Sequence, residues 1–150
     1  MKLKYGETFF ELTLPQERLL GEISVSPHTP SVSEAELVQS ALTGLDAIIA
    51  TFKPNDRVVI VTSDITRYTG SEKYLPILVD RLNGAGIHDR QIEIIIALGI
   101  HRKQTESEHR RILGPLFGRI KVSDHECDDP GKLVYLGKTS NGVEVEINRC

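Results

Sequence analysis

The middle of the chain contains continuous apolar runs that each end in a polar loop. The run Val58–Val61 stops at Thr62 and is followed by hydroxyl, carboxylate and guanidinium groups. A second run around Ile94–Ile96 stops at Leu98. Short unbroken apolar runs of this kind are typical of strands in a sheet that is covered on both faces. We therefore predict strands over residues 57–62, 91–98 and 120–123.

Helical patterns separate these strands. Apolar residues recur three and four positions apart between residues 71 and 84, which predicts a helix there. A helix over residues 106–113 is expected to stop at Gly114-Pro115, and an earlier helix is expected to end or be interrupted at Gly44. Capping boxes, in which a hydroxyl residue precedes a glutamate by three positions, predict two of the helix starts: Ser33 with Glu36, and Thr105 with Glu108.

Short strand-like segments at both ends of the chain predict antiparallel hairpins. The paired segments and their turns are 2–5 with 9–14 around Gly6-Glu7, and 133–138 with 143–147 around Asn141-Gly142. A further short strand is predicted over residues 19–25. The whole pattern predicts an α/β fold: an open, mostly parallel sheet with helices on its faces, in which a Rossmann-like βαβ core is flanked by antiparallel hairpins.

The loops that follow the first two buried strands are the candidate functional site. Residues 63–70 and 99–105 occupy equivalent places in successive strand–helix units, so both loops lie at the same edge of the sheet. In open α/β sheets, ligands bind at the carboxyl ends of the strands. If the two strands are neighbours, the two loops face one crevice.

The first loop, with the sequence SDITR, offers groups that bind anions. Arg67 can donate two parallel hydrogen bonds to a carboxylate or phosphate, and Asp64 can accept from ligand hydroxyls. The following helix N-terminus adds backbone N–H groups and a favourable dipole. The alternative is structural: Asp64 or Ser63 only caps the turn, and Arg67 pairs with Glu72 on the surface.

The second loop carries a histidine at the same edge. Gly99 allows the chain to turn sharply after its strand, and His101 then projects near the end of the sheet. Histidine takes and returns a proton near neutral pH, which suits general acid–base catalysis. The alternative is a loop histidine that is hydrogen-bonded to the backbone.

Two other histidines were considered as functional groups. His109 lies among charged residues of a predicted helix, so we expect it on the surface. His125 lies in the acid-rich stretch Asp124–Asp129, which resembles a set of metal ligands. Because metal ligands usually come from separated positions on two elements, we expect an acidic surface turn there and assign no metal ligand in this chain.

Composition narrows the class of protein. The chain has 150 residues, the length of one ordinary domain, and we expect a single domain over residues 1–150. A net charge of −3 gives no electrostatic reason to expect nucleic acid or an anionic membrane as a partner. No apolar run approaches the roughly 20 residues that span a bilayer, and the N-terminus lacks a signal-peptide pattern. Cys127 and Cys150 have no metal-like spacing, so we expect reduced thiols and a cytoplasmic location.

Three common catalytic motifs are absent from the sequence. The chain has no GxGxxG after its first buried strand, no GxxxxGK[ST] and no GxSxG. These absences argue against a dinucleotide oxidoreductase, a P-loop nucleotidase and a serine hydrolase with a nucleophile elbow.

The two loops together resemble a known family. The SDxTR motif at residues 63–67 and the GxHRxxT motif at 99–105 are similar to those in the N-terminal domain of the nickel-pincer-dependent lactate racemase family. The later stretches VSDHECDD and LVYLGKTSNGVEVEINR also resemble that family. The likeness covers the chain from about Arg57 to Arg149 and is weaker in the first hairpin.

The resemblance implies a cofactor, a substrate and site residues. Asp64, Ile65, Thr66 and Arg67 would contact a nickel-pincer nucleotide, which is a nickel pyridinium bisthiocarboxylate mononucleotide, and Arg67 would also hold the substrate carboxylate. His101 would be one of two catalytic acid–base histidines. In the family, the hydroxyl proton of a 2-hydroxy acid such as lactate is removed while a hydride moves from the same carbon to the cofactor. Return of the hydride to either face of the ketone gives racemisation.

The resemblance also implies that part of the active site lies outside this chain. In full-length members, the second catalytic histidine, the tethering lysine and the nickel-binding histidine all lie further along the sequence. We therefore expect an N-terminal fragment of a two-domain enzyme, inactive without its C-terminal domain. Two alternatives stay open: a racemase or epimerase of another hydroxy acid or sugar acid, and a non-catalytic anion- or nucleotide-binding module.

Overall fold

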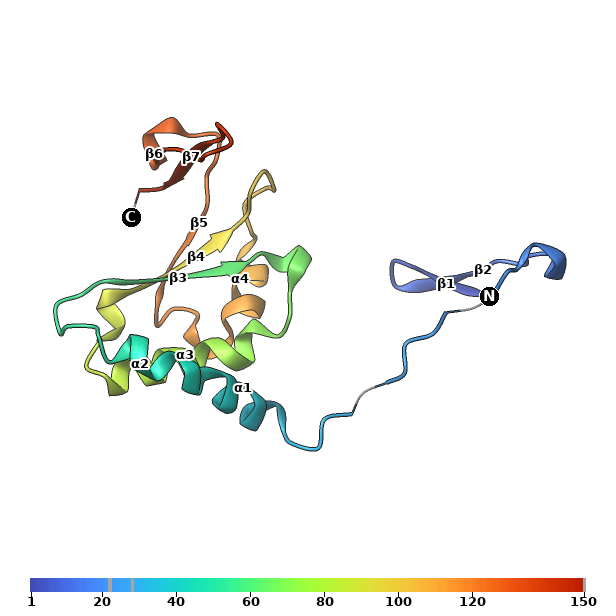
Figure 1. Cartoon of the computed structure of the whole chain (residues 1–150), viewed down its shortest axis with the longest axis horizontal. Coiled ribbons are helices and arrows are strands. Elements are labelled where there is room, and N and C mark those ends of the chain that lie inside the picture. The colour runs from blue at the N-terminus through green and yellow to red at the C-terminus, as the bar shows by residue number, and fades with distance from the viewer. Residues whose placement is uncertain (22, 28, 150) are drawn as a thin grey trace. The chain divides into compact units, whose positions relative to one another are not determined.

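In the computed structural model, which describes residues 1–21, 23–27 and 29–149, three parallel strands form a sheet (Figure 1). They are β3 (Val58–Ser63), β4 (Ile92–Ala97) and β5 (Lys121–Asp124), in the spatial order β3-β4-β5. Each strand lies within one residue of the predicted bounds. Because β3 and β4 are neighbours, as are β4 and β5, the loops that follow them lie at one edge of the sheet.

The helices are α1 (Glu34–Leu42), α2 (Asp46–Ile49), α3 (Ser71–Gly84) and α4 (Glu106–Leu113). They occur along the chain in the predicted order: α1 and α2 come before β3, α3 follows β3, and α4 follows β4. Both predicted capping boxes are present, at the starts of α1 and α4. Gly44 lies in a 3-10 turn that separates α1 from α2. No helix in the described ranges has the length and apolar character that crossing a membrane requires.

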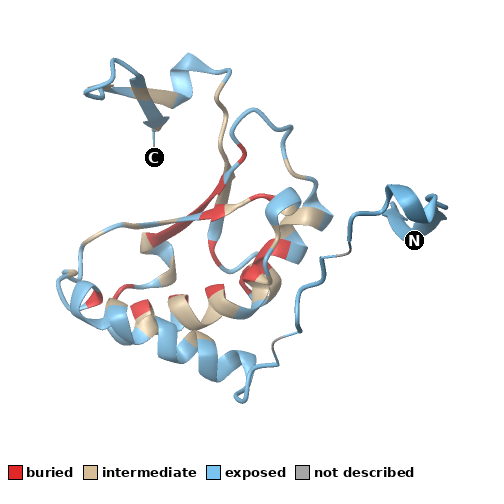
Figure 2. Ribbon diagram, turned by 45° about the vertical axis from the view of Figure 1, so that its right-hand side comes forward, coloured by how far each residue is buried: buried red, intermediate tan, exposed pale blue. Residues whose placement is uncertain are grey.

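The hydrophobic core lies between the sheet and helices α2, α3 and α4 (Figure 2). The core side chains come from both layers and are at most 2% exposed: Leu75, Val79, Leu82, Ile94, Ile96 and Ile112. Each such side chain contributes about 1.5–3 kcal/mol through its burial. The packed layer therefore gives the loops at the sheet edge a rigid base.

The second face of the sheet is covered less completely than the apolar runs predict. Val59 is 42% exposed and Val61 is 66% exposed, whereas Ile95 on the next strand is buried. The prediction that β3 is covered on both faces is therefore wrong for the described chain. Along β3, alternate residues face the helices, and an apolar run alone does not show what covers the other side.

Two hairpins form separate two-stranded sheets. The strands are β1 (Lys2–Tyr5) with β2 (Thr8–Glu11), and β6 (Leu133–Lys138) with β7 (Glu144–Asn148). The first hairpin belongs to a compact unit that ends at Ser31, and the rest of the chain forms a second unit. The prediction of a strand over residues 19–25 is wrong for its described members, because no partner strand pairs with them. Glu22 in that segment lies outside the described residues.

Candidate functional site

The sheet register brings the two candidate loops together. Ser63, the last residue of β3, pairs with Ala97, the last residue of β4. Asp124 pairs with Ile96, so the end of β5 lies at the same level of the sheet. Three consecutive parallel strands thus end side by side, and the polar residues that follow them can reach one another.

Asp64 connects the two loops. It caps the short 3-10 turn Ile65–Arg67: its Oδ1 accepts hydrogen bonds from the backbone N of Thr66 (3.0 Å) and from the Thr66 hydroxyl (2.6 Å). Its Oδ2 contacts Nδ1 of His101 in the second loop. Asp64 is only 2% exposed, so its carboxylate interacts mainly with these two residues. The structural alternative in which Asp64 caps the turn is therefore confirmed. Asp64 also contacts His101, so capping is not its only interaction.

The charge of Asp64 determines which nitrogen of His101 carries the proton. Burial raises the pKa of Asp64, but hydrogen bonds from Thr66 and His101 outweigh burial and hold that pKa below the ordinary value of 3.8. An ionised carboxylate only accepts hydrogen bonds, so Nδ1 of His101 must donate. In the neutral imidazole, Nε2 then has the free lone pair, and no described residue bonds to it. With 45% of its side chain exposed, His101 can meet a ligand.

Arg67 is the free cation of the site. It lies at the end of the turn Ile65–Arg67 and is exposed. Within the described ranges its guanidinium has no hydrogen bond or ion pair, and the pair with Glu72 that the structural alternative required does not form. A guanidinium without a carboxylate partner, one turn from a helix N-terminus, is available for an anionic ligand.

The second loop is anchored at its ends. Gly99 has φ +58°, a left-handed conformation that allows the sharp exit predicted for it. Arg102 donates two hydrogen bonds of 2.8 Å, one to each carboxylate oxygen of Glu108 in the first turn of α4. These contacts hold the loop to α4, whose N-cap is Thr105.

A hollow of about 260 Å³ lies beside His101. It is lined by residues 99 and 101–103 of the second loop and by residues 125–129, which follow β5. Arg67 and the rest of the first loop do not line this hollow. The structure thus joins the two loops through the Asp64–His101 contact, and the hollow lies between the second loop and the segment that follows β5.

The expectation for one of the other histidines, His109, needs correction. His109 is not a surface residue: its side chain is 19% exposed, and its Nε2 lies 2.8 Å from Oδ1 of Asp124, whose side chain is 8% exposed. The charged residues around His109 in α4 did not indicate that its side chain faces Asp124 at the end of β5. Nδ1 of His125 contacts Oδ1 of Asn148. In the described part of the chain, no group of three or more His, Cys, Asp or Glu residues lies close enough together to hold a metal.

Gln104 and Asp124 also belong to the site, although the sequence pattern did not indicate this role for them. The backbone N of Gln104 donates to Oδ2 of Asp124 (2.8 Å), and its side-chain Oε1 accepts from the backbone N of Ile65 (3.1 Å). Gln104 thereby links the second loop both to β5 and to the first loop. The only signal in the sequence is its place inside the GxHRxxT motif.

Comparison with known sequences gives a consistent result. The family model described as the lactate racemase N-terminal domain matches residues 5–150. The lactate racemase of Thermoanaerobacterium thermosaccharolyticum is 26% identical over 99% of this chain, which covers 36% of that protein. The lactate racemase of Lactiplantibacillus plantarum is 26% identical over 98% of this chain and is likewise covered to 36%. This chain therefore spans little more than a third of the length of these relatives.

Comparison with solved structures supports the same fold. The lactate racemase apoprotein from T. thermosaccharolyticum superposes with a TM-score of 0.77 at 26% identity, over 98% of this chain and 35% of that one. A Thermotoga maritima protein superposes with a TM-score of 0.59 at 21% identity, over 77% of this chain and 30% of that one. The second match bears on the fold alone.

Proposed function

The chain belongs to the lactate racemase N-terminal domain family, and on that premise we propose that it is the N-terminal part of a nickel-dependent 2-hydroxy-acid racemase. In this proposal it supplies one acid–base histidine, His101, and one substrate-binding cation, Arg67. Lactate is the proposed substrate because both relatives are named lactate racemases. The observation that carries the proposal is the contact between buried Asp64 and half-exposed His101.

His101 would remove the hydroxyl proton of the substrate. With Nδ1 donating to Asp64, the lone pair on Nε2 is free to take that proton. The imidazolium formed in this step is stabilised by the ionised Asp64 carboxylate, as in other carboxylate–histidine pairs. When the hydride returns to the face that it left, the same Nε2 would return the proton to the substrate oxygen. A second acid–base group for the opposite face of the substrate would come from outside this chain.

Arg67 would hold the substrate carboxylate. Its guanidinium is exposed and unpaired within the described residues, and its donors match the two oxygens of a carboxylate. Its turn is fixed at one end by Asp64 and by Gln104. A carboxylate held there gives the 2-hydroxy acid a defined orientation.

The residues present fit part of a nickel-pincer nucleotide site. Residues 65–67 would hold the nucleotide directly, and buried Asp64 would support their turn. Arg67 and the adjoining start of α3 offer positive charge to a phosphate, since no described side chain caps that helix end. When bound, the cofactor would supply two-electron chemistry and receive the hydride from the substrate carbon. The nickel ligand and the tethering lysine are expected outside this chain.

The role of Arg67 can be tested with the gene's full-length product loaded with nickel-pincer nucleotide. Racemisation of L-lactate and of L-lactamide, which lacks the carboxylate, is compared in wild type and Arg67→Ala. A charged hydrogen-bonded pair is worth about 1.5–3 kcal/mol, so the KM for lactate should rise about 10- to 100-fold. Wild type should prefer lactate, and the variant should lose that preference. An unchanged KM for lactate would contradict the assignment, and binding without turnover in wild type would favour a non-catalytic module.

A further inference from the structure

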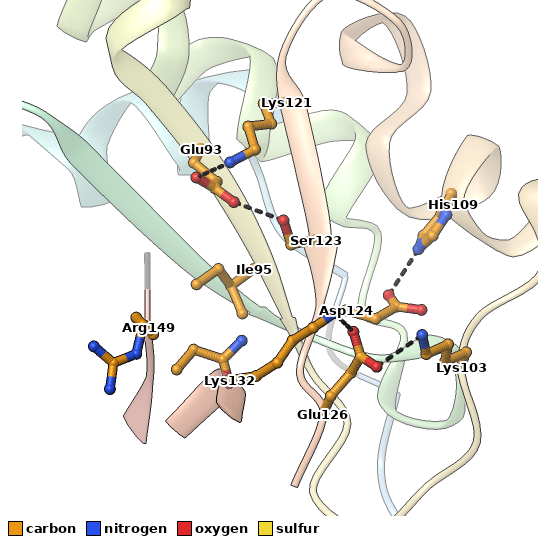
Figure 3. A pocket seen from close by; sticks show the side chains of 11 residues that line it. Glu93, Ile95, Lys103, His109, Lys121, Ser123, Asp124, Glu126, Lys132 and Arg149 are labelled. Atoms are coloured by element: carbon orange, nitrogen blue, oxygen red, sulfur yellow. Dashed lines mark hydrogen bonds and ion pairs between the residues drawn. The ribbon is translucent and has the colours of Figure 1, made fainter. Parts of the chain in front are cut away.

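Asp124 ends β5 and accepts one hydrogen bond on each carboxylate oxygen. Oδ1 accepts from Nε2 of His109 in α4 at 2.8 Å, and the two side chains point toward one another (Figure 3). Oδ2 accepts from the backbone N of Gln104 at 2.8 Å. With its side chain 8% exposed and both oxygens engaged, Asp124 is a fixed anchor for the groups bonded to it.

Gln104 extends this anchor to the first loop. Its backbone is held by Asp124, and its side-chain Oε1 accepts from the backbone N of Ile65 at 3.1 Å. Ile65 is the first residue of the turn that carries Arg67. We call the three residues Gln104, Asp124 and His109 the cross-loop strut, because they connect α4, β5 and the two loops.

The strut runs beside the contact that orients the proposed base. Gln104 lies three residues after His101, and Ile65 lies one residue after Asp64. The same two loops are therefore connected twice, by Gln104 to Ile65 and by His101 to Asp64. Since His101 is half exposed, core packing does not fix its ring, and its position depends on how the two loops are held together.

We propose that Gln104, anchored by Asp124 and His109, is a positioning residue that keeps the two loops in register so that Asp64 can orient His101. This proposal rests on the proposed function, in which His101 is the acid–base group. Gln104 itself does not touch the reacting atoms in this account. Removing its acceptor oxygen would leave the Ile65 N–H without a partner and release one of the two links.

Two matched substitutions test the strut in the full-length protein. Gln104→Met keeps the side-chain length but removes the acceptor, whereas Gln104→Glu keeps an acceptor oxygen at the same place. Amide hydrogen exchange is measured in a peptide that covers Ile65, with a β4 peptide that covers Ile94 as an internal reference. Gln104→Met should speed exchange at Ile65 at least tenfold and leave Ile94 unchanged, and Gln104→Glu should retain the protection.

The same proteins, loaded with nickel-pincer nucleotide, are assayed for lactate racemisation. Gln104→Met should lower kcat/KM at least tenfold, and Gln104→Glu should restore it to within about threefold of wild type. Unchanged amide exchange at Ile65 in Gln104→Met would contradict the proposal that Gln104 holds the first loop to the second. Fast exchange with unaltered racemisation would overturn its positioning role and leave the proposed function standing. No turnover of any 2-hydroxy acid by wild type would overturn the proposed function, and the positioning role with it.

Discussion

Asp64 is almost fully buried, whereas 45% of the His101 side chain that it contacts is exposed. This asymmetry suits a carboxylate that orients an imidazole without meeting the ligand. The sequence predicted that Asp64 and His101 lie at one edge of the sheet, because their loops follow successive strands. It did not predict their contact, which depends on the register of β3 against β4 and on the turn that Asp64 caps.

Asp64→Asn tests whether Asp64 orients His101, because it replaces only one carboxylate oxygen with an NH2 group. Asparagine can still accept from Thr66, but its NH2 group would face Nδ1 of His101 and favour the tautomer whose Nε2 carries the proton. Nε2 could then not act as a base, and we expect kcat for lactate racemisation to fall on the order of 100-fold or more. The assay uses the full-length, cofactor-loaded protein. The same change at Asp80, whose side chain is 68% exposed on α3, is the control, and equal activity of both variants would contradict the role of Asp64.

The lowered pKa of Asp64 also predicts how stability depends on pH. Burial raises this pKa, but hydrogen bonds from Thr66 and His101 lower it more, so the folded value lies below 3.8. Such a group stabilises the fold above about pH 3.8, and this contribution is lost as the pH falls through the lower folded value. Urea unfolding followed between pH 6 and pH 2.5 should show a smaller loss of stability in Asp64→Asn than in wild type. Parallel curves would mean that Asp64 is not ionised as described.

At the element scale, helix α4 and the turn after it fix the second loop against α3. Thr105 and Glu108 cap α4, and hydrogen bonds from Arg102 and Thr105 lower the pKa of Glu108 to about 2. The capping boxes were readable from the sequence because their partners are three residues apart. The packing of the α4 C-terminus on α3 was not readable, since it joins residues about forty positions apart.

Gly114, the C-cap of α4, lies where α4 packs against Glu72 of α3. A Cβ there would lie 2.7 Å from Cβ of Glu72 in α3, and the backbone φ is +52°. Gly114→Ala should therefore lower the free energy of unfolding by about 2–4 kcal/mol, through strain and overpacking. The matched control is Gly84→Ala, where a Cβ meets nothing within 4 Å and φ is not positive, so the change should stay within about 1 kcal/mol. Denaturant unfolding of both variants measures the difference, and equal effects would contradict the packing described.

At the scale of the whole molecule, the apolar pattern predicted the positions of the three parallel strands in the sequence better than it predicted what covers them. The sheet is parallel and three-stranded, and β4 is buried along nearly its whole length, as its isoleucines predict. Val59 and Val61 gave the same signal but are exposed. An apolar run indicates that both faces of a strand are suited to burial. It does not indicate which element covers each face, because that element can lie far along the sequence or outside this chain. This chain spans 36% of the length of its relatives.

In the proposed function, this chain carries one acid–base half of a racemase site. The most direct measurement is the rate at which L-lactate becomes D-lactate in the presence of the full-length protein loaded with nickel-pincer nucleotide, compared with its His101→Ala variant. We expect turnover by wild type and a loss of at least 100-fold in kcat for the variant, with cofactor content unchanged. Equal turnover by the two proteins would contradict the role of His101, and with it the account of the site given by Asp64, Arg67 and the two loops.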